Sequence, residues 1–131
     1  MRILALDYGA ARTGVAISEA METIVRPYGV VERAATPAGL EEIAALVREE
    51  AVDSVVVGLP LTLRGEHGAQ ARETEAFVSS LRQALAVPVA TYDERFTTSL
   101  AAQVSGDAPE DARAAAHLLE SYLAWKSRRP S

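Results

Sequence analysis

The sequence predicts an α/β fold in which a mixed five-stranded sheet carries helices on both faces. Three apolar runs follow one another at short spacing within the first 33 residues, and strands so close together pair as an antiparallel meander. Two later apolar runs are separated by helical patterns, which is typical of parallel strands. Because the chain has 131 residues and 49% of them are hydrophobic, we expect a single domain over residues 1–131 that folds without a disulfide.

The predicted meander occupies the N-terminal quarter of the chain. Its first strand runs from Ile3 to Leu6 and ends in Asp7-Tyr8-Gly9, where glycine favours a turn. The second strand, Gly14–Ser18, follows closely enough to form a hairpin with the first. The third, Thr23–Arg33, contains Pro27 and is therefore expected near a sheet edge, where a missing N–H donor is tolerated.

The rest of the chain alternates helices and strands. Thr36 and Pro37 are suited to begin a helix as N-cap and first helical residue, and helical spacing continues to about Ala51. Asp53–Leu59 contains three consecutive valines and no alternation of apolar with polar residues, which is typical of a strand buried on both faces in a parallel sheet. The remaining predicted elements are a helix over 69–85, a strand over 87–92 and helices over 98–104 and 109–126.

Composition bounds the partners and the compartment. The net charge of −5 counts against nucleic acid, because neutralising phosphates supplies much of the affinity of nucleic-acid binders. On the other side, twelve of the thirteen basic residues are arginine, the better bidentate phosphate ligand, and a bound cation would neutralise acidic residues in a metal site. The chain has no cysteine, no apolar run of the roughly 20 residues that span a bilayer, and no signal-peptide pattern at its N-terminus. We therefore expect a cytoplasmic protein that does not contact the membrane.

Acidic residues follow two strands of the predicted sheet. Asp7 ends the first strand and Asp93-Glu94 ends the last, and ligands of open α/β sheets collect at such carboxyl ends. Asp111 lies in the first turn of the last helix, where the helix dipole alone would explain a carboxylate. Side chains alternate along a strand, so Asp93 and Glu94 cannot both join the site, and alternation leaves open which one does. Three carboxylates without a neighbouring His or Cys suit a hard cation such as Mg²⁺ or Mn²⁺.

Four blocks of the sequence match a known family in the same order. They are Asp7-Tyr8-Gly9 with Arg12 and Gly14-Val15-Ala16; Val57–Leu61 with Gly65, Gly68 and Gln70; Asp93–Thr98; and Asp111–Ala115 with Leu118, Leu119, Tyr122 and Leu123. Through these blocks the chain resembles, nearly end to end, the YqgF/RuvX family of candidate Holliday junction resolvases and pre-16S rRNA nucleases of bacteria.

The resemblance implies an RNase H-like fold and a nuclease that hydrolyses phosphodiester bonds in structured nucleic acid. Its substrates would be the 5′ end of pre-16S rRNA, Holliday junctions or both. The family's acidic positions fall on Asp7, Glu94 and Asp111, which would hold one or two Mg²⁺ or Mn²⁺ ions for two-metal-ion hydrolysis.

Four further residues are predicted to contact the substrate: Arg12, Gly58, Arg95 and Thr97. Arg12 should project beside Asp7, and Arg95 and Thr97 are placed to bind phosphate, while Gly58 would let substrate or metal approach the sheet edge. Gly9 and Gly14 flank the first turn, either for turn geometry or for close approach of a phosphate.

The chain departs from the family pattern at two places. Ala11 stands where the family usually carries a lysine, and the family's longer Lys-rich loop is replaced by the short acidic segment 105–110. Both departures remove phosphate-binding charge, and their effect on the strength and type of nucleic-acid binding is open.

Two other classes of protein share some of these sequence features. An actin-like or sugar-kinase-like ATPase also opens with an Asp-x-Gly strand and a glycine-bearing hairpin, but it closes two domains around a nucleotide and 131 residues make only one. A catalytically silent nucleic-acid-binding module would leave three filled acidic positions without a role.

Within the nuclease class, the choices of DNA junction or rRNA, of Mg²⁺ or Mn²⁺, and of oligomeric state stay open. A resolvase should form a homodimer at least on its substrate, because a symmetric cut needs two active sites.

Overall fold

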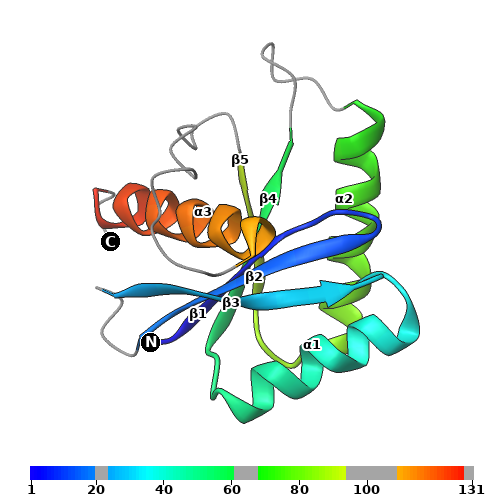
Figure 1. Ribbon diagram of the computed structural model, residues 1–131, viewed down its shortest axis with the longest axis horizontal. Coiled ribbons are helices and arrows are strands. Elements are labelled where there is room, and N and C mark those ends of the chain that lie inside the picture. The colour runs from blue at the N-terminus through cyan, green and yellow to red at the C-terminus, as the bar shows by residue number, and fades with distance from the viewer. Residues whose placement is uncertain (20–23, 61–67, 94–108, 129–131) are drawn as a thin grey trace.

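The computed structural model describes residues 1–19, 24–60, 68–93 and 109–128 (Figure 1). The strands are β1 Ile3–Asp7, β2 Arg12–Ser18, β3 Val25–Glu32, β4 Ser54–Leu59 and β5 Val89–Asp93. The helices are α1 Pro37–Glu49, α2 Ala69–Ala84 and α3 Glu110–Ser127. The strands form one sheet in the order β3-β2-β1-β4-β5, antiparallel among β1 to β3 and parallel from β1 through β4 to β5. The predicted mixed sheet, a meander joined to two parallel strands, is confirmed.

The observed boundaries differ from the predicted ones by one residue in β1, which ends at Asp7, and in β4, which begins at Ser54, and by more in the other strands. β2 begins at Arg12, two residues before the predicted start, because Arg12 and Thr13 pair with β3 although they are not part of an apolar run. β3 is shorter than predicted at both ends, and β5 begins at Val89, not at 87. Proline has no N–H to donate to a ladder, which explains why β5 starts after Pro88. The helix predicted over 98–104 lies outside the described residues.

β3 is an edge strand, as Pro27 predicted. Its pairing with β2 shifts register: Val15 lies opposite Gly29 and Ala16 lies opposite Pro27, so Tyr28 is an extra residue. Such bulges bend an edge strand and limit its pairing with other chains. Helix α1 also begins as predicted, with the Thr36 side chain accepting a hydrogen bond of 3.1 Å from the Gly39 N–H and with Pro37 as first helical residue.

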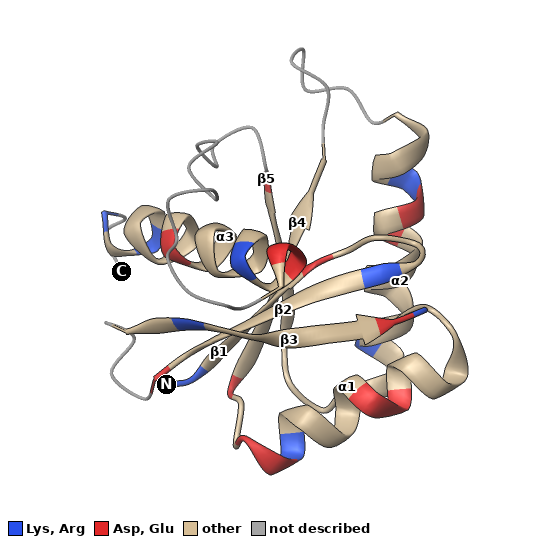
Figure 2. Ribbon diagram, viewed as in Figure 1, with Lys and Arg blue, Asp and Glu red and all other residues tan. Residues whose placement is uncertain are grey.

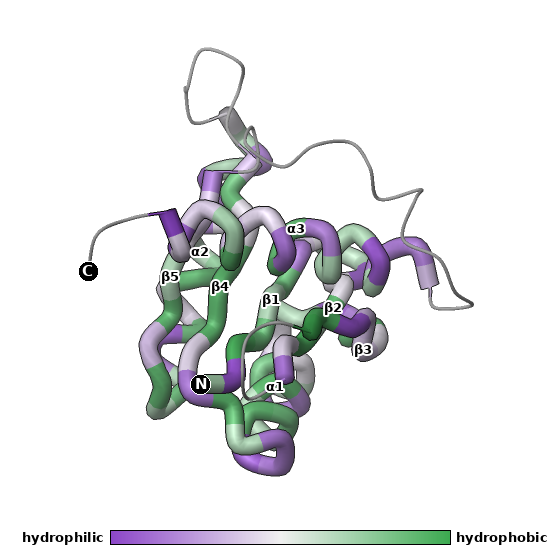
Figure 3. Tube along the Cα trace, turned by 90° about the vertical axis from the view of Figure 1, so that its left-hand side faces the viewer, coloured by the Kyte–Doolittle hydropathy of each residue, from purple (hydrophilic) through white to green (hydrophobic). Residues whose placement is uncertain are grey.

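The two faces of the sheet are covered differently (Figures 1 and 3). Helices α1 and α2 cover one face, where large apolar side chains of the sheet and of the helices pack together, among them Leu4, Leu6, Ile43, Phe77 and Leu81. Helix α3 covers the other face, where small side chains meet: Ala5 and Ala16 of the sheet, Ala115 and Ala116 of the helix. Small residues on both elements let α3 approach the backbone of β1 and β2 closely. Within the part of the chain that the structure describes, no helix is long and apolar enough to cross a membrane.

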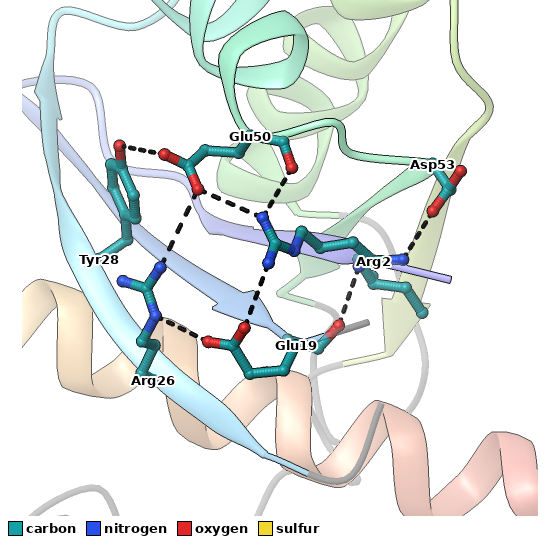
Figure 4. A network of polar contacts seen from close by, with 8 residues as sticks. Arg2, Glu19, Arg26, Tyr28, Glu50 and Asp53 are labelled. Carbon is teal, nitrogen blue, oxygen red and sulfur yellow. Dashed lines mark hydrogen bonds and ion pairs between the residues drawn. The ribbon is translucent and has the colours of Figure 1, made fainter. Parts of the chain in front are cut away.

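A network of polar contacts joins elements at the opposite end of β1 from Asp7 (Figure 4). Arg2 donates through Nη1 to the Glu50 carbonyl at 2.9 Å and through Nη2 to Glu19 Oε2 at 3.2 Å. Arg26 Nε donates to Glu19 Oε1 at 3.0 Å, and the Tyr28 hydroxyl donates to Glu50 Oε2 at 3.2 Å. The network therefore connects the start of β1, the end of β2, the edge strand β3 and the end of α1.

The network makes stability depend on pH through Glu19. The hydrogen bond from Arg26, followed by the positive charges of Arg2 and Arg26, holds the pKa of Glu19 below its ordinary value of 4.5. A carboxylate with a lowered pKa contributes stability above pH 4.5, and this is lost as the pH falls through the folded-state pKa. Glu19→Gln should therefore lower the melting temperature slightly at pH 7, and the difference from the parent protein should vanish on acidification below pH 4.5. Thermal melts between pH 7 and pH 3 measure this.

Glu41→Gln is the matched control, since Glu41 is an exposed glutamate of α1 whose side chain pairs with the exposed Arg48 at 3.3 Å. Exposed single pairs contribute little, so this variant should melt like the parent at every pH. A constant destabilisation of Glu19→Gln across the pH range would show that the charge of Glu19 is not what stabilises the fold.

Candidate active site

Asp7 ends β1 on the face of the sheet that α3 covers. Along β1, Ile3 and Ala5 pack towards α3, whereas Leu4 and Leu6 pack towards α1 and α2. Because side chains alternate along a strand, Asp7 shares the face of Ile3 and Ala5. It is half-buried, at the carboxyl end of a strand in the parallel part of the sheet, as predicted.

Gly14 brings the first turn of α3 against the sheet beside Asp7. Gly14 is the cross-strand partner of Asp7, and directly opposed residues share one face. A Cβ built on Gly14 would overlap the backbone carbonyl of Asp111. Gly14 thus makes room for the helix, a role that neither of the two interpretations of the sequence included. At Gly9 a Cβ would overlap the carbonyl of Arg12, which supports the turn interpretation there.

Asp111 lies in the first turn of α3, as predicted, and Arg12 pairs with it. The distance from Arg12 Nε to Asp111 Oδ2 is 3.3 Å, with 67% of the Arg12 side chain and 37% of the Asp111 side chain exposed. A pair this exposed contributes little to stability. Its value is geometric, since it shows that the β1–β2 hairpin and the start of α3 face each other, as the charged segments in Figure 2 also show. Arg12 and Gly14 share a face by alternation, so Arg12 lies on the Asp7 side of the sheet.

β4 and β5 complete this edge of the sheet. Gly58 is buried in β4 opposite Tyr92 of β5. Val56 and Tyr92 both pack towards α3, so Gly58 occupies a position on the α3 face. Asp93 follows Tyr92 and therefore lies on the other face, the side of Val89. Glu94, Arg95 and Thr97 lie outside the described residues.

The donor atoms at this edge suit a hard cation. Asp7 and Asp111 reach it from a strand and from a helix, and both offer only oxygen. Divalent cations such as Mg²⁺ and Mn²⁺ prefer carboxylate ligands. Among the residues that the structure describes, no group of three or more His, Cys, Asp or Glu side chains gathers as a metal site. The third predicted acid, Glu94, is outside that part of the chain.

Tyr8 anchors the hairpin on the other face, a role that the sequence analysis did not assign. Its ring stacks on Phe77 of α2, with centroids 4.4 Å apart and planes at 22°. Burial raises the pKa of the Tyr8 hydroxyl above 10.0, and the negative charge of Glu73 raises it further. Tyr8 therefore keeps its proton at neutral pH and does not act as a base. Its alternation with Leu4 and Leu6 was the available signal that it faces the helices.

The described edge thus has two carboxylates beside an arginine, at the carboxyl end of a parallel strand. Residues 1–125 match the RuvX family, described as Holliday junction resolvase. The chain belongs to the RuvX family. Among its relatives, a protein of Chloroflexus aurantiacus is 39% identical over 98% of this chain and 90% of its own length, and one of Rubrobacter xylanophilus is 44% identical over 93% and 91%. Both are named as candidate pre-16S rRNA nucleases.

Solved structures agree on the fold. A Thermus thermophilus RuvC in complex with a Holliday junction substrate superposes with a TM-score of 0.60 at 17% identity, covering 100% of this chain and 99% of that one. The Fowlpox virus resolvase bound to Holliday junction DNA gives a TM-score of 0.60 at 12% identity, covering 96% and 99%. The predicted RNase H-like fold and the predicted nuclease class are therefore confirmed, and the ATPase alternative is not favoured.

Proposed function

We propose that this RuvX-family nuclease hydrolyses phosphodiester bonds with Asp7, Glu94 and Asp111 as metal-binding catalytic residues. The observation that carries the proposal is the contact at Gly14. It puts the first turn of α3, and with it Asp111, directly over the cross-strand partner of Asp7. Asp7 and Asp111, far apart in the sequence, therefore belong to neighbouring backbone segments at the carboxyl edge of the sheet. The helix dipole explains an acid in the first turn of α3 but not this contact with β2.

The register of β5 favours Glu94 over Asp93 as the third acid. Asp93 follows Tyr92 in β5, so strand alternation assigns it to the face opposite α3, whereas Asp7 and Asp111 belong to the α3 side. Glu94 is the next residue along the chain and the one at the family's acidic position. This choice is a proposal, and Asp93→Asn compared with Glu94→Gln tests it: the first should keep cleavage activity and the second should lose it.

The chain's own residues have separate tasks in this site. Asp7 offers oxygen from the rigid sheet and Asp111 offers it from the helix. One or two bound Mg²⁺ or Mn²⁺ ions would supply an activated water and stabilise charge on the leaving oxygen. Arg12, two-thirds exposed beside Asp111, is placed to bind a phosphate of the substrate. Gly58, although buried in β4, adds no side chain on the α3 face of the sheet, and Arg95 and Thr97, which follow β5 in the sequence, would bind phosphate.

We infer that precursor 16S rRNA, cut near its 5′ end, is the first substrate to test, because the relatives with 39–45% identity carry that name. Holliday junction DNA is the second, since the family is described by that activity. Either substrate would place the protein in the cytoplasm. A cleavage panel of junction, duplex, single-stranded DNA and structured RNA separates the two. Cutting of the junction should coincide with a homodimer on the DNA, whereas rRNA trimming needs one protomer.

Chelation gives the first test of the metal. EDTA should abolish cleavage and added Mg²⁺ or Mn²⁺ should restore it, because the described donors are carboxylate oxygens that prefer hard cations. The measurement is cleavage of end-labelled substrate before and after metal is returned to the same sample. Activity that persists in excess chelator would remove the metal from the mechanism.

A further inference from the structure

Arg33 is an exposed arginine with a left-handed backbone conformation, and the proposed active site does not yet use it. Its φ is 48°, a conformation that crowds the Cβ of any residue except glycine against the following carbonyl. The other described non-glycine residue with a positive φ is Ala51, at 53°, which follows the end of α1, an ordinary place for this conformation. Arg33 instead follows the strand β3, where glycine would be accommodated without strain. A large charged residue at such a position favours a role for its side chain.

The backbone of Arg33 is held against the β1–β2 hairpin. Its N–H donates to the carbonyl of Ala11 at 3.0 Å. Ala11 directly precedes Arg12, and Arg12 lies opposite Glu32, the residue before Arg33. On its other side, the Arg33 carbonyl accepts hydrogen bonds from the Thr36 N–H at 3.0 Å and from the Thr36 hydroxyl at 2.7 Å. Arg33 therefore has a fixed place beside the end of the hairpin that carries Arg12.

The side chain of Arg33 carries a positive charge that no carboxylate of the described residues neutralises. It has no ion pair or side-chain hydrogen bond there, and the exposed Glu32 pairs with neither Arg33 nor Arg12. Figure 2 shows this basic segment directly after the acidic end of β3. Arg2 and Arg26, by contrast, are held by carboxylates in the network of Figure 4. In a protein with a net charge of −5, attraction of phosphate must depend on individually placed cations such as this one.

We propose that Arg33 binds a phosphate of the substrate next to the phosphate that Arg12 binds, so that the two arginines hold the nucleic-acid backbone along the outer end of the β1–β2 hairpin. A guanidinium can donate two parallel, charge-assisted hydrogen bonds to a phosphate. Because the backbone of Arg33 is already fixed, only its side chain must be ordered on binding. The inference rests on the proposed function and adds a direction to it. The substrate extends from the carboxylates over the hairpin towards the end of β3, at the edge of the sheet opposite β5.

The test compares Arg33→Gly, which removes the charge and the backbone strain together, with Arg33→Lys, which keeps both. Binding to a fluorescein-labelled four-way DNA junction and to a labelled RNA hairpin is measured by anisotropy in Ca²⁺ at several salt concentrations, and cleavage of the same probes is measured in Mg²⁺. Arg33→Gly should weaken binding about tenfold and lower the slope of log K against log salt by about one unit, because one phosphate contact is lost. It should nevertheless melt roughly 2–5 °C higher than the parent, because the strain is relieved. Arg33→Lys should keep the slope and bind with intermediate affinity.

Two control variants separate strain from charge. Ala51→Gly relieves the other left-handed residue, next to the network of Figure 4, and should raise the melting temperature without changing binding. Arg48→Met removes one positive charge from an exposed site on α1 and should leave affinity and slope unchanged.

The inference fails, while the nuclease assignment stands, if Arg33→Gly keeps the parent affinity and salt slope. It fails equally if Arg33→Lys binds as weakly as Arg33→Gly, or if Arg48→Met lowers the slope as much as Arg33→Gly does. If the parent protein neither binds nor cleaves either probe, the proposed function itself fails.

Discussion

Gly14→Ala should destabilise the protein by about 3 kcal/mol or more, at the upper end of what an added buried methyl group costs. The new Cβ would overlap the carbonyl of Asp111, a backbone atom in the first turn of α3 that cannot turn aside as a flexible side chain would. The start of α3 must therefore move away from β2, which also separates Asp111 from Asp7. We expect a melting temperature lower by roughly 10 °C and loss of most cleavage activity. Thermal melts and cleavage assays on the same preparation measure both effects.

Gly29→Ala is the control for this result. Gly29 lies in the neighbouring strand β3, opposite Val15, and a Cβ there would meet nothing within 4 Å. Replacing glycine by alanine at a compatible position reduces the entropy of the unfolded chain, so stability should be unchanged or slightly higher. If Gly14→Ala were as stable and as active as Gly29→Ala, the close contact between α3 and β2 would not exist as described. Asp111 would then not be held by this contact at the carboxyl edge of the sheet.

The fold could be predicted from local patterns because each described element carries its own signal. The valines of β4 and the Thr36-Pro37 start of α1 needed no knowledge of the rest of the chain. The predicted strand boundaries were wrong where backbone pairing with a neighbouring strand, and not the apolar run, determines where a strand begins or ends. Arg12 is exposed and charged, yet it belongs to β2 because its backbone pairs with Glu32.

The candidate site could be predicted only in part. The positions of Asp7 after a strand and of Asp111 in a first turn follow from spacing, and the role of the three acids came from family resemblance. The close contact of Gly14 with Asp111 could not be predicted, because it joins residues far apart in the sequence. The orientation of Asp93 likewise required the register of β5 and the packing of Tyr92 under α3.

Asp7→Asn should abolish cleavage while leaving the protein folded. Outer residues that support a metal ligand typically contribute 10–100-fold to affinity or activity, so loss of a direct ligand should reduce cleavage by more than about 100-fold. Asparagine keeps the shape of the side chain and removes one of the like charges that would otherwise repel in the metal-free site. Without metal the variant should therefore melt at the same temperature as the parent or slightly higher. Saturating Mn²⁺ should stabilise it less than the parent, because that gain follows RT ln(1 + [L]/Kd).

Asp111→Asn should behave like Asp7→Asn if both acids hold the same metal. Glu110→Gln is the control that distinguishes loss of a metal ligand from loss of a favourable interaction with the helix dipole. Glu110 is exposed in the same first turn of α3, so it shares the dipole interaction, typically about 0.3–1 kcal/mol, without facing the site. Loss of the exposed Arg12 pair adds at most about 1 kcal/mol to the effect of Asp111→Asn. Glu110→Gln should keep both cleavage and the full Mn²⁺ shift, whereas Asp111→Asn should lose both. Equal behaviour of the two variants, a small destabilisation with an undiminished Mn²⁺ shift, would mean that Asp111 serves only the helix and that the metal site lies elsewhere.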